Sequence, residues 1–205
     1  MKMITEFLNG SSIVEGRFDT TAYNKVIDDA LRSIGVRNLL MSYEGDAGQF
    51  ANQDTNAKRI CDTINASGKA KALTTAEYYT ATTGNDPALL SKRDWARFDR
   101  KNGDIIIVDD KNNALCKIDL KVSQKYTGSV ALGSLIDFDN GLYVCVNIGK
   151  GTYTIVTHED VVNLAKSGKL YPPAESRSYK GFPVIWEGQR LTSEYYVRGS
   201  DIERL

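Results

Sequence analysis

The chain has a single histidine, three cysteines and no long hydrophobic run, and each shortage excludes a class of protein. A Ser-His-Asp triad, a Cys-His pair or a histidine-rich zinc site would have to be centred on His158. This residue stands beside Glu159 and Asp160 at the start of an expected helix, where a solvated first-turn residue is the simpler interpretation. The chain also lacks a Cys-x-x-Cys motif and a phosphate-binding glycine loop, which removes the main support for nucleotide hydrolysis and Rossmann cofactor binding.

Cysteine usage and the N-terminal segment predict a reduced, intracellular protein. Cys116 and Cys145 lie in apolar alternating runs where a small buried thiol packs well, and an odd number of cysteines does not form a disulfide framework. No 18 apolar residues run together, and Glu6 interrupts the only apolar stretch at the start. We therefore expect a cytoplasmic protein without a secretory signal and without a membrane partner.

Net charge does not point to any partner. The 26 lysines and arginines balance 26 aspartates and glutamates, so the formal net charge is zero. A site for nucleic acid or another anion must therefore be local. With 205 residues, the chain is long enough for one substantial core.

Hydrophobic periodicity changes along the chain from a helical period to a period of two. The first part predicts a helical N-terminal element over residues 1–73, with a polar, turn-rich loop or hinge at 44–56. The second part, 74–205, predicts a core that carries a β-sheet and a C-terminal extension. We expect helices over 20–34, 56–66, 74–84 and 157–168, and strands over 104–108, 114–122, 142–147 and 152–156.

The segment "GDIIIVDDKNNALCKIDLKVS", residues 103–123, predicts an antiparallel hairpin. A turn centred between Lys111 and Asn112 pairs residues whose numbers sum to a constant, and this register places Asp104 opposite Asp119. Cross-strand Cβ atoms are about 4.5–5.5 Å apart, so two carboxylates there repel unless a cation lies between them. Oxygen ligands of this kind suit Mg²⁺.

Alternation also predicts two faces for this hairpin. The apolar face contains Ile105, Ile107, Cys116, Ile118, Leu120 and Val122. The other face contains Asp104, Asp119, Lys117 and Lys121 together with Ile106, Val108 and Leu115. Lys121 lies one pleat from Asp119, where an ammonium group can orient a metal-bound water and offset charge on a phosphate.

These residues resemble the PD-(D/E)XK nuclease superfamily, which carries an acid at the start of one strand and acid-any-Lys on the next. The matching positions are Asp104, Asp119 and Lys121, with Gly103 in place of the proline that often precedes the first acid. The resemblance covers roughly residues 74–166 and implies an α/β fold of the restriction-endonuclease type, a mixed sheet flanked by helices. It also implies a helix near 127–135.

The resemblance further implies a role for each site residue. Asp104, Asp119 and the carbonyl of Leu120 would hold Mg²⁺ or Mn²⁺, and Lys121 would position the attacking water. Family members often place a glutamate on a preceding helix, and "AEYY" at 76–79 nominates Glu77 as a catalytic residue and metal ligand.

A basic segment, residues 91–104, precedes the first of these acids. Its cations surround Trp95 and Phe98, which is also the pattern of an ordinary amphipathic helix with solvated charges. Beside a metal site, the same cations are candidate contacts to nucleic-acid phosphates. The candidates are Lys92, Arg93, Arg97 and Lys125.

The function that follows from the resemblance is metal-dependent hydrolysis of DNA phosphodiester bonds, in a restriction, repair, recombination or phage role. The alternative is a non-catalytic protein that binds nucleic acid or takes part in an assembly and keeps the fold without the chemistry. A homodimer is left open.

Overall fold

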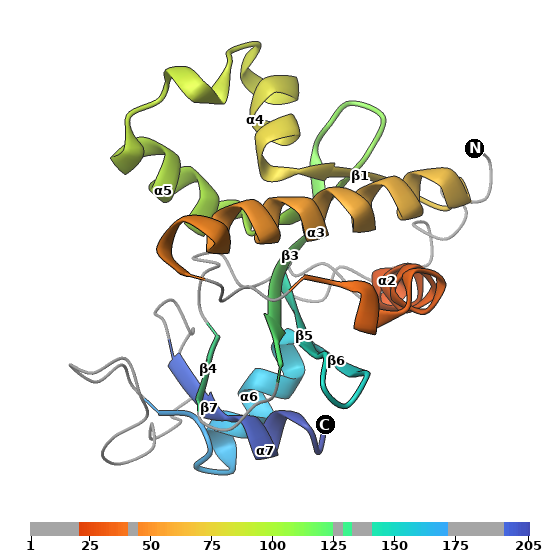
Figure 1. The fold of residues 1–205 in the computed structure, drawn as a ribbon, viewed down its shortest axis with the longest axis vertical. Coiled ribbons are helices and arrows are strands. Elements are labelled where there is room, and N and C mark those ends of the chain that lie inside the picture. The colour runs from red at the N-terminus through yellow and green to blue at the C-terminus, as the bar shows by residue number, and fades with distance from the viewer. Residues whose placement is uncertain (1–20, 41–44, 125–128, 133–140, 172–194) are drawn as a thin grey trace.

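The computed structural model describes residues 21–40, 45–124, 129–132, 141–171 and 195–205, and side chains are described for most of these. Helices alternate with strands along the chain (Figure 1). The helices are α2 (Thr21–Ile34), α3 (Gly45–Ser67), α4 (Thr75–Thr83), α5 (Lys92–Asn102), α6 (His158–Lys166) and α7 (Gly199–Ile202). The strands are β1 (Lys71–Thr74), β2 (Ile105–Val108), β3 (Ala114–Ser123), β4 (Ser129–Leu132), β5 (Gly141–Asn147), β6 (Thr152–Val156) and β7 (Tyr195–Arg198).

Five strands form a mixed sheet in the order β1-β2-β3-β5-β6. Its neighbours are antiparallel except for β3 and β5, which run parallel with Asp119 opposite Tyr143. Two parallel strands need a long crossover, and the chain between β3 and β5 includes β4, which pairs with β7 in a separate two-stranded sheet. The predicted α/β class with a mixed sheet and flanking helices is confirmed.

One face of the sheet packs against α2 and α3, which cross it in Figure 1. The spacing of apolar residues in α2 predicts this contact, because Tyr23, Ile27, Leu31 and Ile34 recur on one helical face and are all buried. The sheet contributes the predicted apolar face of the hairpin. Its members in this core are Ile105, Ile107, Cys116, Ile118, Leu120 and Val122.

The opposite face carries a second apolar cluster. Tyr143 and Cys145 of β5 pack there against α6, α7 and the two-stranded sheet. Helix α6 begins as the sequence predicts, with Thr157 and Asp160 in a capping box, and it buries Val161, Leu164 and Ala165.

Two local predictions need correction. The segment expected to be a loop at 44–56 belongs almost entirely to α3, which begins at Gly45 and continues without interruption to Ser67. Residues 127–135 were expected to form a helix, but Ser129–Leu132 form strand β4. The rest of that range lies outside the described residues. The N-terminal helices α2 and α3 share their core with the sheet, whose first strand, β1, follows α3 directly.

In the described parts of the chain, none of the helices combines the length and the apolar character that a membrane crossing requires.

Truncation of Ile118 tests the sheet at its centre. This side chain is 1% exposed and belongs to the core between the sheet and the two N-terminal helices. Ile118→Ala should lower the free energy of unfolding by about 2–5 kcal/mol, because it removes buried methyl groups and leaves a cavity. Urea unfolding followed by circular dichroism measures this loss. Leu89→Ala is the matched control, since Leu89 is exposed, and a control that destabilises equally would contradict this packing.

Candidate acidic site at the end of the central strands

The predicted hairpin register is confirmed over the half that leads to the acids. Ile105 pairs with Ile118 and Ile107 with Cys116, which is the register that continues to Asp104 and Asp119. Nearer the turn, the register shifts between Ile107 and Val108, so that Val108 pairs with Ala114. This irregularity moves Leu115 to the core side, although alternation placed it on the face of the acids.

Asp104 lies immediately before β2 and is buried. Its Oδ2 atom accepts a hydrogen bond of 2.6 Å from the main-chain N–H of Leu120, and its Oδ1 atom accepts one from the side-chain amide of Gln53. Its main-chain N–H donates to the carbonyl of Ile118 at 2.8 Å. The first acid is therefore fixed by β3 and by α3 together.

Asp119 lies in the middle of β3 and is 2% exposed. Its partner on β5 is Tyr143, and that of Lys121 is Cys145, so both side chains lie on the face of the second apolar cluster. Lys121 Nζ forms an ion pair with Asp119 Oδ2 at 2.9 Å. That oxygen is buried, and the Lys121 ammonium is the cation that lies against it.

The charges of this group interact strongly. Burial first, and then the charge of Asp119, raises the pKa of Asp104 well above its usual range. The Leu120 N–H and the Lys121 ammonium act in the opposite direction without cancelling this effect. For Lys121, burial acts to lower the pKa, but the Asp119 and Asp104 carboxylates outweigh it and raise the pKa. Asp104 therefore keeps its proton to a higher pH than an exposed aspartate does, and a cation bound beside it would favour its ionised form.

A third acid of this group, Asp99, was not predicted from the sequence. It lies in the last turns of α5, and burial, followed by the charges of Asp119 and Asp54, raises its pKa to about 6. Gln53, which binds Asp104, was also missed. Asp99 precedes Asp104 by only five residues, so its nearness to the acids could have been inferred from the sequence. Gln53 is brought to Asp104 by the packing of α3, which the local sequence does not indicate.

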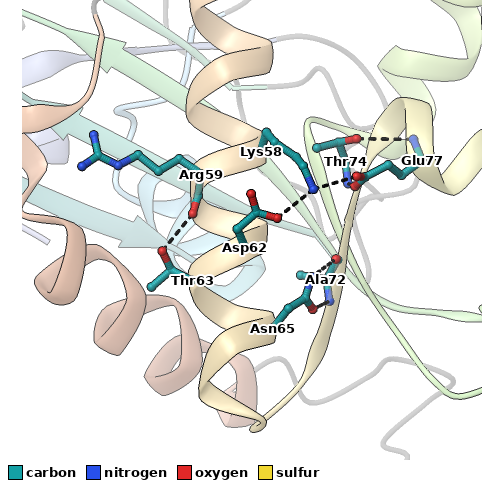
Figure 2. Close-up of polar contacts among 8 residues, drawn as sticks. All are labelled: Lys58, Arg59, Asp62, Thr63, Asn65, Ala72, Thr74 and Glu77. Atoms are coloured by element: carbon teal, nitrogen blue, oxygen red, sulfur yellow. Dashed lines mark hydrogen bonds and ion pairs between the residues drawn. The ribbon is translucent and has the colours of Figure 1, made fainter.

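Glu77 has a different environment, shown in Figure 2. Its carboxylate accepts the Thr74 N–H at 2.9 Å in a capping box at the start of α4, and it pairs with Lys58 at 2.9 Å. Burial acts to raise the pKa of Glu77, but the Thr74 and Lys58 contacts outweigh it and lower the pKa. Lys58 also pairs with Asp62 at 2.7 Å, so this network ties α3 to α4. The role of Glu77 as a metal ligand stays a prediction.

The predicted basic segment forms α5, and Lys92, Arg93 and Arg97 are exposed on it. Lys125 lies outside the described residues. Trp95 and Phe98 are only partly buried and belong to neither apolar core. The face of α5 that carries them packs against α4 instead of the sheet.

The donors present fit a divalent cation held by two carboxylates. Among the described residues, no three histidine, cysteine, aspartate or glutamate side chains gather as a metal centre. Two carboxylates, main-chain carbonyls and waters suffice for Mg²⁺. The raised pKa of Asp104, which follows from burial and from the nearby charge of Asp119, is the feature that a nearby cation would relieve.

Comparisons with protein-family models, with curated proteins and with solved structures found no match for this chain.

The two acids with a raised pKa, Asp104 and Asp99, predict a loss of stability at high pH. The unfolded chain releases the protons of Asp104 and Asp99 near pH 4, whereas the folded protein holds them to higher pH. The unfolded state therefore binds fewer protons in this window, and the free energy of unfolding falls as pH rises through it. Asp104→Asn removes the charge, and the Gln53 amide can rotate to accept from the new NH₂ group. Its melting temperature should exceed that of the wild type at pH 8, by about 2–4 °C for each kcal/mol of repulsion relieved.

Calorimetric melting from pH 4 to pH 8 measures this difference, in the absence of divalent cations. Asp109→Asn is the control, because hydrogen bonds from Asn113 and Lys111 lower the pKa of Asp109 in the hairpin turn. It should not stabilise the protein at pH 8. An Asp104→Asn protein that melts below the wild type at pH 8 would show that the charge of Asp104 is needed for folding.

Proposed function

We propose that the chain is a metal-dependent nuclease that hydrolyses DNA phosphodiester bonds with Mg²⁺ or Mn²⁺. The observation that carries the proposal is the pair of interacting buried carboxylates, Asp104 and Asp119, with Lys121 held against the second. The resemblance to PD-(D/E)XK nucleases and their restriction-endonuclease-like fold supports it. The hairpin and the later strands at 141–147 and 152–156 that the resemblance uses all form.

In this proposal, Asp104 and Asp119 bind the cation, and the Leu120 carbonyl supplies a further oxygen. The bound cation would stabilise negative charge on the phosphate and lower the pKa of a bound water. Gln53 and the Leu120 N–H hold the carboxylate of Asp104 in position. Asp99 has its pKa raised to about 6, which suits an acid that binds and releases a proton near neutral pH.

Lys121 has two tasks in the proposed reaction. Its ammonium group is placed by the 2.9 Å contact with Asp119 and is 25% exposed, so a substrate phosphate or a water can reach it. There it orients the attacking water and offsets the charge that accumulates on the phosphate. The raised pKa keeps it protonated at neutral pH, so it acts as a cation rather than as a base.

The second candidate is a protein that binds nucleic acid or joins an assembly without catalysis. The observation in its favour is that the acids already have partners within the chain. Both oxygens of Asp104 accept hydrogen bonds, and Lys121 partly neutralises Asp119. Mutation of the lysine separates the two candidates.

Lys121→Ala should reduce nicking of supercoiled plasmid by about 100-fold or more in the presence of Mg²⁺ or Mn²⁺. Its affinity for the metal, measured by calorimetry, should be unchanged or tighter, because Lys121 competes electrostatically with the cation for Asp119. Asp119→Asn should lose both cleavage and metal binding. Lys71→Ala is the matched control on the same sheet, since Lys71 is exposed and its ammonium group bonds Asn112 of the hairpin turn, away from the acids.

A wild-type protein that binds DNA and does not cleave it with either metal would favour the non-catalytic candidate. Equal cleavage by the wild type and by Lys121→Ala would contradict the role given to Lys121.

A further inference from the structure

The chain between β1 and β2 leaves the sheet as a pair of helices and returns beside its starting point. We call residues 75–102 the arm. At its base, the Thr75 N–H donates to the Asp104 carbonyl at 3.3 Å, and the Thr75 hydroxyl donates to the carbonyl of Gly103. Figure 1 shows α4 and α5 above α3 in the view, whereas β3, β5 and β6 lie below it. The arm is thus anchored at the first acid of the candidate site.

An aromatic cluster holds the two helices of the arm together. The ring centroids of Tyr79 and Phe98 are 5.1 Å apart, those of Trp95 and Phe98 are 6.1 Å apart, and Tyr78 completes the cluster. Edge-to-face and stacked contacts at such distances are stabilising. Because these rings belong to neither core of the sheet, the arm has an apolar centre of its own.

The tip of the arm is an ordered turn that holds Leu89 in solvent. The Asp86 side chain caps the turn by accepting the Ala88 N–H at 2.9 Å, and its carbonyl accepts the Leu89 N–H at 3.1 Å. Ser91 then caps α5 by accepting the Asp94 N–H at 3.2 Å. With these bonds formed, Leu89 is still 82% exposed.

Positive charge follows directly after this leucine. Helix α5 carries five cations and two acids, a net charge of +3 in a chain whose total is zero. Lys92 and Arg93 lie in its first turn, and Arg97 lies one turn further along the helix. None of the five cations forms an ion pair with an acid in the described part of the chain, so their charge is available to a polyanion.

We propose that Leu89 is a wedge that enters the base stack of duplex DNA while Lys92 and Arg93 contact the phosphates beside it. The inference rests on the proposed function and names its substrate as duplex DNA that unstacks at a base step. Proteins that kink DNA insert apolar side chains in this way, and the contacts that the bend permits offset the cost of unstacking. The cations hold the backbone through release of counterions.

A second copy of the chain is a poorer partner for this tip. A symmetric contact through Leu89 would bring the first turns of two α5 helices together, and Lys92 and Arg93 would then face their own copies. Like charges so placed oppose association, whereas a phosphate backbone complements them.

The anchoring of the arm gives the wedge a consequence for cleavage. The Thr75 N–H, where the arm begins, donates to the carbonyl of Asp104. The DNA step that Leu89 enters should therefore lie at a fixed distance from the acidic site. Steps such as TA unstack easily, so cleavage should be enriched at a constant offset from such steps.

The test uses short duplexes that each carry 2-aminopurine at a different position, with Ca²⁺ in place of Mg²⁺ to prevent cleavage. Wild-type protein should raise the fluorescence at a restricted set of positions, because unstacked 2-aminopurine is brighter. Leu89→Ala should abolish this rise and weaken binding by about three- to ten-fold, while the salt dependence of binding stays the same. Lys92→Ala should instead lower the slope of log K against log salt by about one.

Leu205→Ala is the matched control, because Leu205 is also an exposed leucine, 51% exposed, far from the arm in the sequence. A Leu89→Ala protein that retains the fluorescence rise would overturn the wedge, and so would a wild type that does not bind duplex DNA. Loss of self-association in Leu89→Ala, with DNA binding unchanged, would assign the tip to a second copy instead. A wild type that unstacks DNA and never cleaves it with Mg²⁺ would support the wedge and contradict the nuclease.

Discussion

The burial of two adjacent carboxyl groups beside a single lysine is the constraint on which the proposed function depends. Asp104 lies immediately before β2 and Asp119 lies in the neighbouring strand β3, and both side chains are buried. Burial weakens solvation and strengthens every charge interaction. Under the proposed function, a cation that bound to this group would offset part of the free-energy cost of burying its charges.

The rest of the fold holds this group in place. Parallel pairing with β5 places Asp119 and Lys121 beside Tyr143 and Cys145, which belong to the second apolar cluster. On the other side, α3 packs on the sheet and brings Gln53 to Asp104. Lys117, expected near the acids, is buried and donates to the carbonyl of Lys101 at 3.2 Å, so it closes the end of α5. The two layers of helices thus serve the site as well as the core.

The central part of this arrangement could be predicted from the sequence because it is local. Period-two alternation and a polar turn fix the pairing of Ile105 with Ile118, and with it the approach of Asp104 to Asp119. The register shift near the turn could not be predicted in the same way. It accompanies a turn in which the Asp109 carboxylate accepts from Lys111 and Asn113, and Asn112 adopts a φ of 64°.

The missed features are those that tertiary contacts decide. The polar first half of α3 resembles a loop, and it is helical because the helix continues into the apolar residues Ile60 and Ile64, which pack on the sheet. Gln53 meets Asp104 across 51 positions, a separation that no periodicity encodes. Glu77 was nominated by a short pattern that a capping box explains equally well.

Crystals soaked in MnCl₂ at pH 8 provide the most direct measurement of the central claim, because manganese is identified by its anomalous scattering. The account predicts an anomalous peak within ligand distance of both the Asp104 and Asp119 carboxylates, about 2 Å for metal–oxygen bonds of this class. The same soak of Asp119→Asn should lack the peak. A wild-type map with no peak between these carboxylates, or with manganese bound only elsewhere, would contradict the account.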